Sequence, residues 1–123
     1  MTKKIYETNI LLKNIINAIQ DIKGQNIISL NFKNIESAIC KYFVICTGTS
    51  NTHVAAITNS IKKNVSKTLK EKPYSMEGIE NQEWVLMDYV DVVVHIFLKN
   101  VREFYDIENL WGDAKISEIK IKA

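Results

Sequence analysis

The clearest pattern of hydrophobic and polar positions in the chain lies between residues 84 and 98. This stretch is rich in β-branched and aromatic residues, contains no glycine or proline, and is interrupted near its middle by Asp88 and Asp91. Such a pattern is typical of two consecutive strands joined by a tight turn, which we place near Tyr89 and Val90. The stretch therefore predicts a β-hairpin.

The two halves of the predicted hairpin differ. Residues 92–97 are almost all apolar, which indicates a strand that is covered on both faces and lies near the middle of a sheet. A face that carries both an aromatic and a charged residue is rarely all core, so we expect part of the Trp84 face to be a contact surface. Alternation over the first half puts Trp84, Leu86 and Asp88 on that face and Val85, Met87 and Tyr89 on the other.

The first third of the chain contains one helical and two extended patterns. Apolar residues at helical spacing predict an amphipathic helix over about residues 6–23, with Gly24 ending it in a left-handed cap. Residues 26–32 alternate as in a short strand, and a polar connection follows over residues 33–38. Residues 42–46 form an apolar run that is too short for a helix, and we expect them to be a second central strand.

A second helix is predicted after the turn formed by residues 48–53. Ser50 is placed to cap the first backbone amides of this helix, and Pro73 is placed to stop it. Its inner face carries Val54, Ile57, Ile61, Val65 and Leu69, and its outer face carries Lys62, Lys63, Lys67 and Lys70. No aromatic residues interleave with the lysines, so we interpret them as a solvated helix face rather than an RNA contact. Residues 74–78 predict a short extended segment before the hairpin.

The region after the hairpin predicts a short helix and a tail. Asn100 and Glu103 are spaced as a helix cap and its reciprocating residue. Three apolar residues would lie near one face of this helix: Phe104, Ile107 and Trp111. Gly112 would end the helix, and residues 113–123 are expected to form a charged, mobile tail.

The predicted elements follow the order helix, strand, strand, helix, hairpin and helix, which indicates an α/β fold. The sheet should be mixed, because a hairpin is antiparallel whereas the long second helix allows a parallel crossover. With 123 residues, 46% of them apolar, the chain is large enough to form one domain with its own core. We assign this domain to residues 1–114 and the tail to residues 115–123.

Composition and charge argue against several classes of protein. The net charge of +2 does not by itself support nucleic-acid binding. No apolar run approaches the roughly 20 residues that span a bilayer, and the start of the chain has no signal-peptide core. Cys40 and Cys46 lack a zinc or redox spacing and are interpreted as buried, reduced thiols. We therefore expect a cytoplasmic protein without membrane contact.

Three places in the sequence could carry chemistry. Residues 48–50 could cradle a phosphate at a helix start, but they lack the glycine spacing of a dinucleotide site and the lysine of a P-loop. Asp88 and Asp91 are three residues apart across a turn, which directs them to opposite sides rather than onto one metal ion. His95 could act as an acid or base, but no nucleophile motif accompanies it, and we favour a structural or interface role. We expect no metal and no cofactor.

Five blocks of the sequence occur in a characteristic order and spacing. They are KYFVICTGTS at 41–50, MEG at 76–78, WVLMDY at 84–89, DVVVHIF at 91–97, and REFY followed by LWGDA between 102 and 114. In this order they resemble the Iojap/RsfS ribosomal silencing factors. The resemblance runs from the first helix to about Ala114.

The resemblance implies a compact α/β domain that is related to the nucleotidyltransferase fold, lacks that fold's activity, and is expected to be a homodimer. It also implies binding to large-subunit ribosomal protein L-fourteen and steric obstruction of small-subunit joining, which lowers translation when nutrients are scarce. The residues that it assigns to this contact are Trp84, Leu86, Asp88 and Tyr89, with Glu77, His95 and Phe97 behind them. No sequence-specific nucleic-acid contact is implied.

One position departs from the family pattern. The family usually has glycine where this chain has Val90, between Tyr89 and Asp91. Valine avoids the positive φ that glycine permits, so we expect a turn of another type or a displaced turn.

Two other functions stay open at this point. One is an active nucleotidyltransferase that binds a nucleoside triphosphate at residues 48–50 and magnesium at Asp88 and Asp91, although the spacing of the two carboxylates argues against it. The other is direct RNA binding through the lysine-bearing helix. We favour a non-enzymatic protein that acts by occupying a ribosomal surface.

Overall fold

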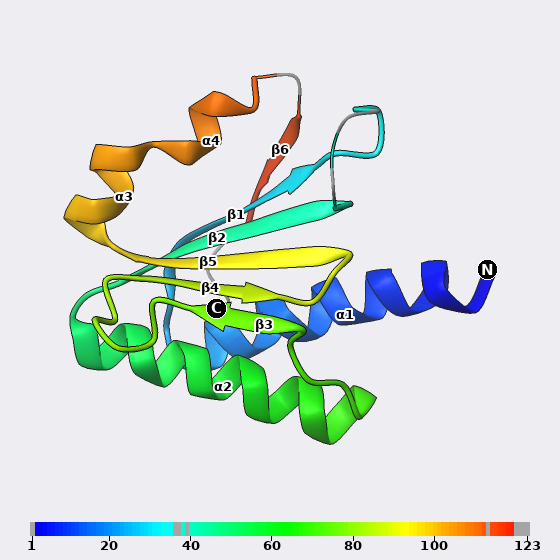
Figure 1. Ribbon diagram of the computed structural model, residues 1–123, viewed down its shortest axis with the longest axis horizontal. Coiled ribbons are helices and arrows are strands. Elements are labelled where there is room, and N and C mark those ends of the chain that lie inside the picture. The colour runs from blue at the N-terminus through cyan, green and yellow to red at the C-terminus, as the bar shows by residue number, and fades with distance from the viewer. Residues whose placement is uncertain (1, 36–37, 39, 113, 120–123) are drawn as a thin grey trace.

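A mixed β-sheet with helices against both faces forms the framework of the protein (Figure 1). The structure is a computed structural model, and it describes residues 2–35, 38, 40–112 and 114–119. The helices are α1 (Thr2–Asp21), α2 (Asn51–Leu69), α3 (Lys99–Tyr105) and α4 (Ile107–Leu110). The strands are β1 (Gln25–Asn31), β2 (Tyr42–Gly48), β3 (Ser75–Glu77), β4 (Trp84–Asp88), β5 (Val92–Leu98) and β6 (Lys115–Glu118). This arrangement confirms the α/β prediction.

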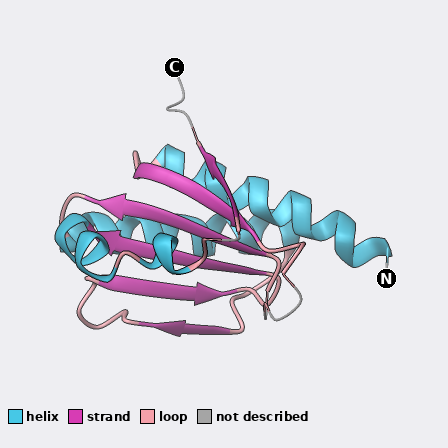
Figure 2. Cartoon of the chain, turned by 90° about the horizontal axis from the view of Figure 1, so that it is seen from above, coloured by secondary structure: helices cyan, strands magenta, loops and turns pink. Residues whose placement is uncertain are grey.

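The described strands form one sheet in the order β3-β4-β5-β2-β1-β6 (Figure 2). Strands β2 and β5 are parallel, and each of the other neighbouring pairs is antiparallel. The predicted hairpin is therefore confirmed as β4 and β5, and both runs expected to be central lie inside the sheet. Burial of both faces explains why their sequences are almost continuously apolar.

Two hydrophobic cores lie on opposite faces of the sheet. The larger core joins α1 and α2 to residues such as Val44 and Val94 on the strands. The smaller core packs Ile107 of α4 against Ile45 and Phe97 on the other face. In Figure 1, α1 and α2 run together along one side of the sheet, whereas α3 and α4 lie together near one corner on the other side. The second face is therefore only partly covered by helices.

The ends of α1 and α2 combine expected and unexpected features. Ser50 caps α2 as predicted, since its hydroxyl oxygen accepts a 3.0 Å hydrogen bond from the His53 amide. The helix ends at a left-handed Lys70, before Pro73. At the end of α1 the left-handed residue is Lys23, not Gly24. Gly24 is instead required by space, because a Cβ atom there would overlap the Ile19 side chain.

The helix after the hairpin differs from its prediction. The residue before α3 is Leu98, which makes no capping bond with its side chain, so the predicted cap at Asn100 is wrong. Asp106 adopts a φ of 46° and its amide donates to the carbonyl oxygen of Arg102, which divides the helix into α3 and α4. Phe104 consequently points into solvent, with 80% of its surface exposed, whereas Ile107 is buried.

The expected mobile tail contains a strand. Residues 115–118 form β6, which pairs antiparallel with β1 at the edge of the sheet. All four residues are exposed, so backbone hydrogen bonds along the open edge of β1 hold this strand, rather than side-chain burial. The strand lies beyond the expected domain boundary at residue 114, and residues 120–123 fall outside the described part of the chain.

The turn of the hairpin also overturns an expectation. Val90 adopts a φ of 75°, so the argument that valine would avoid this conformation is wrong. The Asp91 amide donates to the carbonyl oxygen of Tyr89 at 3.0 Å, which closes a γ-turn centred on Val90. The Asp88 carboxylate accepts a 2.7 Å hydrogen bond from the Val90 amide, and the Tyr89 amide donates to Val92 at 2.9 Å. These bonds hold valine in a backbone conformation that it rarely adopts.

Candidate functional site

The sheet face turned away from α1 and α2 carries most of the residues expected to form a contact surface. On β4, Trp84, Leu86 and Asp88 alternate with fully buried residues and remain partly exposed, as predicted. Leu86 lies between two partners on neighbouring strands. Glu77 of β3 is paired with it on one side, and His95 of β5 is paired with it on the other. Glu77 is exposed. We call Glu77, Trp84, Leu86 and Asp88 the β4 surface.

Trp84 is held from several directions. Its indole ring stacks on Phe97 with 4.8 Å between ring centroids and 28° between planes. The ring of Tyr105 from α3 lies 4.8 Å away at a tilt of 44°. The indole nitrogen donates a 3.1 Å hydrogen bond to Nδ1 of His95. The outer edge of the indole is therefore presented from a fixed position.

His95 lies beneath the β4 surface rather than on it. Only 4% of its surface is exposed, and burial lowers its pKa to about 4. Since Nδ1 accepts the hydrogen bond from Trp84, the neutral ring carries its proton on Nε2, which has no hydrogen-bond partner among the described residues. The ring of Phe43 packs 4.6 Å from it. This environment suits a positioning role better than acid–base chemistry.

Two other residues expected at the contact are also covered. Phe97 is fully buried under Trp84. Tyr89 points to the opposite face, where it joins the core with α1 and α2, and burial raises its pKa to about 12. With 8% of its surface exposed, Tyr89 offers little area to a partner. Tyr89, His95 and Phe97 can thus support a contact through the residues that cover them, but cannot supply most of its area.

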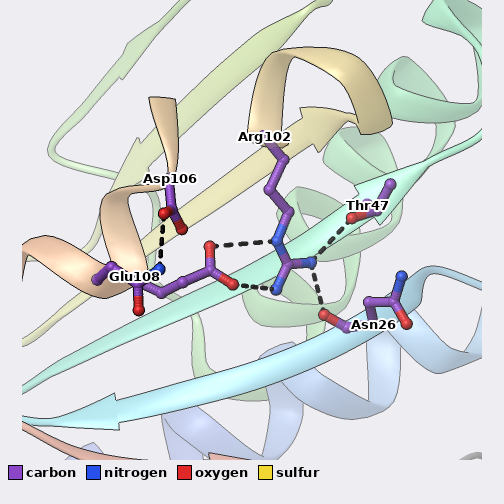
Figure 3. Close-up of polar contacts among 6 residues, drawn as sticks. Asn26, Thr47, Arg102, Asp106 and Glu108 are labelled. Carbon is purple, nitrogen blue, oxygen red and sulfur yellow. Dashed lines mark hydrogen bonds and ion pairs between the residues drawn. The ribbon is translucent and has the colours of Figure 1, made fainter. Parts of the chain in front are cut away.

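Arg102 fastens the α3–α4 segment next to this surface (Figure 3). Its guanidinium group forms an ion pair with Glu108 of α4 at 3.1 Å, and the two side chains are 11% and 23% exposed. It also donates to the carbonyl oxygen of Asn26 at 2.6 Å and to the hydroxyl oxygen of Thr47 at 2.8 Å. One side chain therefore ties two short helices to β1 and β2. The motif around Arg102 was visible in the sequence, but two of its partners, Asn26 and Thr47, are distant in the chain and could not be inferred.

The structure also exposes large apolar residues that the sequence analysis did not assign to the site. Phe104 and Tyr105 of α3 are 80% and 49% exposed, and Leu110 of α4 is 73% exposed. The ring of Phe104 lies 5.0 Å from that of Tyr105, which in turn packs on Trp84. Helical periodicity had placed Phe104 near one face with Ile107 and Trp111, because the break at Asp106 was not recognised.

In the turn considered for phosphate binding, the amides of Thr49, His53 and Val54 already have acceptors. The Thr49 amide donates to Nδ1 of His53 at 2.9 Å, and the His53 amide donates to Ser50. The Val54 amide bonds the carbonyl oxygen of Ser50. A Cβ atom at Gly48 would crowd Val54, so this glycine allows close packing of the strand and the helix. The turn is therefore explained as a helix cap.

The two carboxylates considered for a metal ion have separate partners. Asp88 accepts a hydrogen bond from the Val90 amide, as described above, and Asp91 accepts one from the Thr8 hydroxyl group at 2.9 Å. Among the described residues, no group of three or more histidine, cysteine, aspartate or glutamate side chains is arranged to hold a metal ion. The Asp88 carboxylate thus orders the hairpin turn, and the Asp91 carboxylate links the turn to α1.

The cysteines and the lysine-bearing helix show no site chemistry. Both are free thiols; Cys46 is buried as predicted, whereas Cys40 is partly exposed, so the prediction that it is buried is wrong. Burial is the main cause that raises the pKa of Cys40 to about 11 and that of Cys46 to about 12, which keeps both thiols protonated and weakly nucleophilic.

The expected outer face of α2 is exposed, as predicted: Lys62, Lys63, Lys67 and Lys70. None of the helices in the described part of the chain combines the length and apolar character needed to cross a bilayer.

Comparisons with known proteins agree with this architecture. Residues 5–123 match the family described as ribosomal silencing factor during starvation, RsfS. A protein from Halalkalibacterium halodurans named ribosomal silencing factor RsfS is 42% identical over 110 residues, which are 89% of this chain and 92% of the relative. A protein of the same name from Chromobacterium violaceum is 43% identical over 102 residues, or 83% and 82% of the two chains.

Solved structures give the same result. A crystal structure of a Chromobacterium violaceum protein superposes with a TM-score of 0.79 at 39% identity and covers 92% of this chain and 93% of the other. A structure from Bacillus halodurans gives a TM-score of 0.76 at 37% identity, with coverage of 90% and 99%. The family match includes residues beyond Ala114, which the sequence analysis had left out of the resemblance. This chain belongs to the RsfS family of ribosomal silencing factors.

Proposed function

We propose that this protein represses translation by binding large-subunit ribosomal protein L-fourteen and sterically blocking the joining of the small subunit. It acts by occupancy and not by catalysis. The proposal rests chiefly on one observation, the partly exposed β4 surface on a sheet face that helices cover only in part. Its relatives named ribosomal silencing factor support a ribosomal partner.

The chemistry of the β4 surface suits a basic protein partner. Trp84 and Leu86 offer a fixed apolar patch, and Glu77 and Asp88 lie at its margin. Interfaces of this kind gain most of their free energy from a few apolar anchors in the centre, while charges at the rim favour the correct partner and speed association. A ribosomal protein carries basic groups because it lies against RNA phosphates.

We also propose that the protein is cytoplasmic and forms a homodimer. We expect the cytoplasmic location from the sequence, which has no long apolar run and no signal-peptide core, and the homodimer from the resemblance to the family. Since repression needs only occupancy of one ribosomal surface, the proposal requires no cofactor, metal ion or membrane.

Co-sedimentation of the purified protein with isolated ribosomal subunits tests the proposal. We expect binding to large subunits, with little binding to small subunits. Leu86→Ala should weaken binding about tenfold or more, since truncating a central anchor typically costs about 2 kcal/mol. Trp84→Ala should act similarly but also removes packing on Phe97, so Leu86 gives the cleaner variant. Ile116→Ala, at the opposite edge of the same sheet and 47% exposed, is the matched control and should bind as the wild type does.

Two results would contradict the proposal. One is co-sedimentation with small subunits alone. The other is saturable binding of magnesium and a nucleoside triphosphate that is lost in Asp88→Asn, which would favour the nucleotidyltransferase function instead.

A further inference from the structure

The two aromatic residues of α3, Phe104 and Tyr105, are exposed and extend the β4 surface onto a helix. Tyr105 packs on Trp84 with 4.8 Å between ring centroids, and Phe104 packs on Tyr105 at 5.0 Å with nearly perpendicular planes. We call Phe104 and Tyr105 the α3 ridge. The chain of ring contacts makes the ridge continuous with Trp84, so a partner that covers the β4 surface would meet the ridge as well.

Phe104 contributes little to the fold of the monomer. Its side chain is 80% exposed, and α3 has no fully buried residue. A single exposed aromatic residue is common on protein surfaces, but this ring belongs to a row of three that runs across two elements. Exposed aromatic rings in such a row are typical of binding anchors.

The ridge is held in place before any partner arrives. Arg102 precedes it on α3 and is bonded to Glu108, Asn26 and Thr47, as Figure 3 shows. A contact surface that is already ordered loses less conformational entropy on binding than a mobile loop does. The partly buried ion pair between Arg102 and Glu108 would thus order the ridge for binding as well as hold two short helices.

The charges around the ridge favour a basic protein rather than RNA. Glu103 and Asp106 flank the two aromatic residues in the sequence and are exposed, and Glu77 and Asp88 lie on the adjoining β4 surface. The positive charge of Arg102 is balanced by Glu108, although Lys99 is exposed at the start of the helix. Carboxylates repel phosphate groups and attract lysine and arginine side chains.

We infer that the α3 ridge is the second half of the partner-binding surface, and that Phe104 inserts into an apolar recess on a basic protein. The inference rests on the proposed function, because it assigns the ridge to the same ribosomal protein that the β4 surface contacts. It adds a helix to a contact that the sequence analysis limited to the strands. It also assigns the anchoring role to a residue that lies outside the predicted set.

Equilibrium binding of the full chain to purified large subunits tests this inference. Phe104→Ala should weaken binding at least tenfold, and Phe104→Tyr should keep affinity within about threefold because the ring remains. Tyr74→Ala is the matched control, since Tyr74 is also 80% exposed, and it should change affinity by less than twofold. Glu103→Lys should weaken binding about threefold at low salt. Thermal unfolding of each variant verifies that the fold is retained.

The outcomes separate the inference from the proposed function. If Phe104→Ala binds as the wild type does while Leu86→Ala is weakened, the ridge is not part of the surface, and the proposed function stands. If Glu103→Lys tightens binding, the ridge faces RNA phosphates and the assignment to a basic protein is wrong. If the wild-type chain does not bind large subunits at all, both the inference and the proposed function fail.

Discussion

The indole nitrogen of Trp84 donates a hydrogen bond to Nδ1 of His95 across the β4–β5 pair. The bond joins a residue of the proposed contact surface to one that is buried under it. Because it needs an acceptor at Nδ1, it exists only while His95 is neutral. The orientation of Trp84 on the β4 surface therefore depends on the protonation state of the buried His95 ring.

The stability of the protein should depend on pH through His95. Burial lowers the pKa of this histidine from 6.5 to about 4 in the folded protein, so between these values the unfolded chain binds a proton that the folded chain excludes. The free energy of unfolding should be unaffected by this residue above pH 6.5 and should fall as the pH decreases toward 4, by about 3 kcal/mol. Urea unfolding at pH 7 and pH 4.5 measures the change.

The control for this prediction is His95→Asn, whose amide oxygen can accept the bond from Trp84 but does not titrate. Carboxylates contribute the same background in both proteins. The difference in stability between pH 7 and pH 4.5 should therefore be smaller in the variant. Equal losses in the two proteins would exclude His95 as the cause.

Replacement of Val90 by glycine should stabilise the hairpin. Val90 has a φ of 75° at the centre of the γ-turn, and a left-handed backbone costs a residue with a branched side chain about 1–2 kcal/mol. Its side chain is 49% exposed, so little burial is lost. Val90→Gly should raise the free energy of unfolding by about 1 kcal/mol, measured by urea denaturation. Val90→Ala keeps a Cβ atom and should recover less than half of this gain; an equal gain would show that side-chain contacts rather than backbone strain are responsible.

Loss of Arg102 should loosen α3 and α4 before it unfolds the sheet. Arg102→Ala leaves Glu108 and the oxygens of Asn26 and Thr47 without this donor, which we expect to cost about 3 kcal/mol. Amide hydrogen exchange should become at least tenfold faster over residues 99–110 and change much less in β5. Arg102→Lys should restore only part of the protection, because lysine cannot reproduce the planar fork of donors. Unchanged exchange over α3 and α4 would show that the ion pair does not hold them.

The connection between β3 and β4 should require Gly78. This residue has a φ of 78°, and a Cβ atom on it would overlap the carbonyl oxygen of Trp84. Gly78→Ala should therefore destabilise the protein by about 2 kcal/mol or more, measured by thermal or urea unfolding. Gly112→Ala is the control, since a Cβ atom there meets no atom within 4 Å, and it should change stability by less than about 0.5 kcal/mol. Similar effects of the two substitutions would argue against a steric requirement at Gly78.

The central part of the fold was predictable from local patterns. Strands β2 and β5 have apolar, β-branched sequences because both of their faces are buried, and the capping residue Ser50 marks the start of α2. The alternation in β4 correctly separated Trp84 from Tyr89. The assignment of Tyr89 to the contact came from the resemblance and not from the alternation, which had placed it on the other face.

The features that the sequence did not reveal depend on contacts between distant parts of the chain. Strand β6 is exposed and charged, and its position is set by backbone bonds to β1. The helix breaks at Asp106 because this residue adopts a left-handed conformation, and no glycine at this position signals the break in the sequence. The conformation of Val90 was also not predictable, because it is imposed by hydrogen bonds of the turn: the Val90 amide donates to Asp88, and the Asp91 amide donates to Tyr89. The exposed position of Phe104 follows from the break at Asp106, so the α3 ridge could not be predicted.

Obstruction of subunit joining can be measured directly with purified ribosomal subunits. Purified large subunits are first incubated with the protein, small subunits are then added, and light scattering follows the formation of joined ribosomes. We expect the wild-type chain to suppress joining in a saturable manner. A folded Leu86→Ala variant should need at least tenfold more protein for the same effect. Equal obstruction by wild type and Leu86→Ala, or undiminished joining at saturating wild-type protein, would contradict the claim that the β4 surface acts by occupying the large subunit.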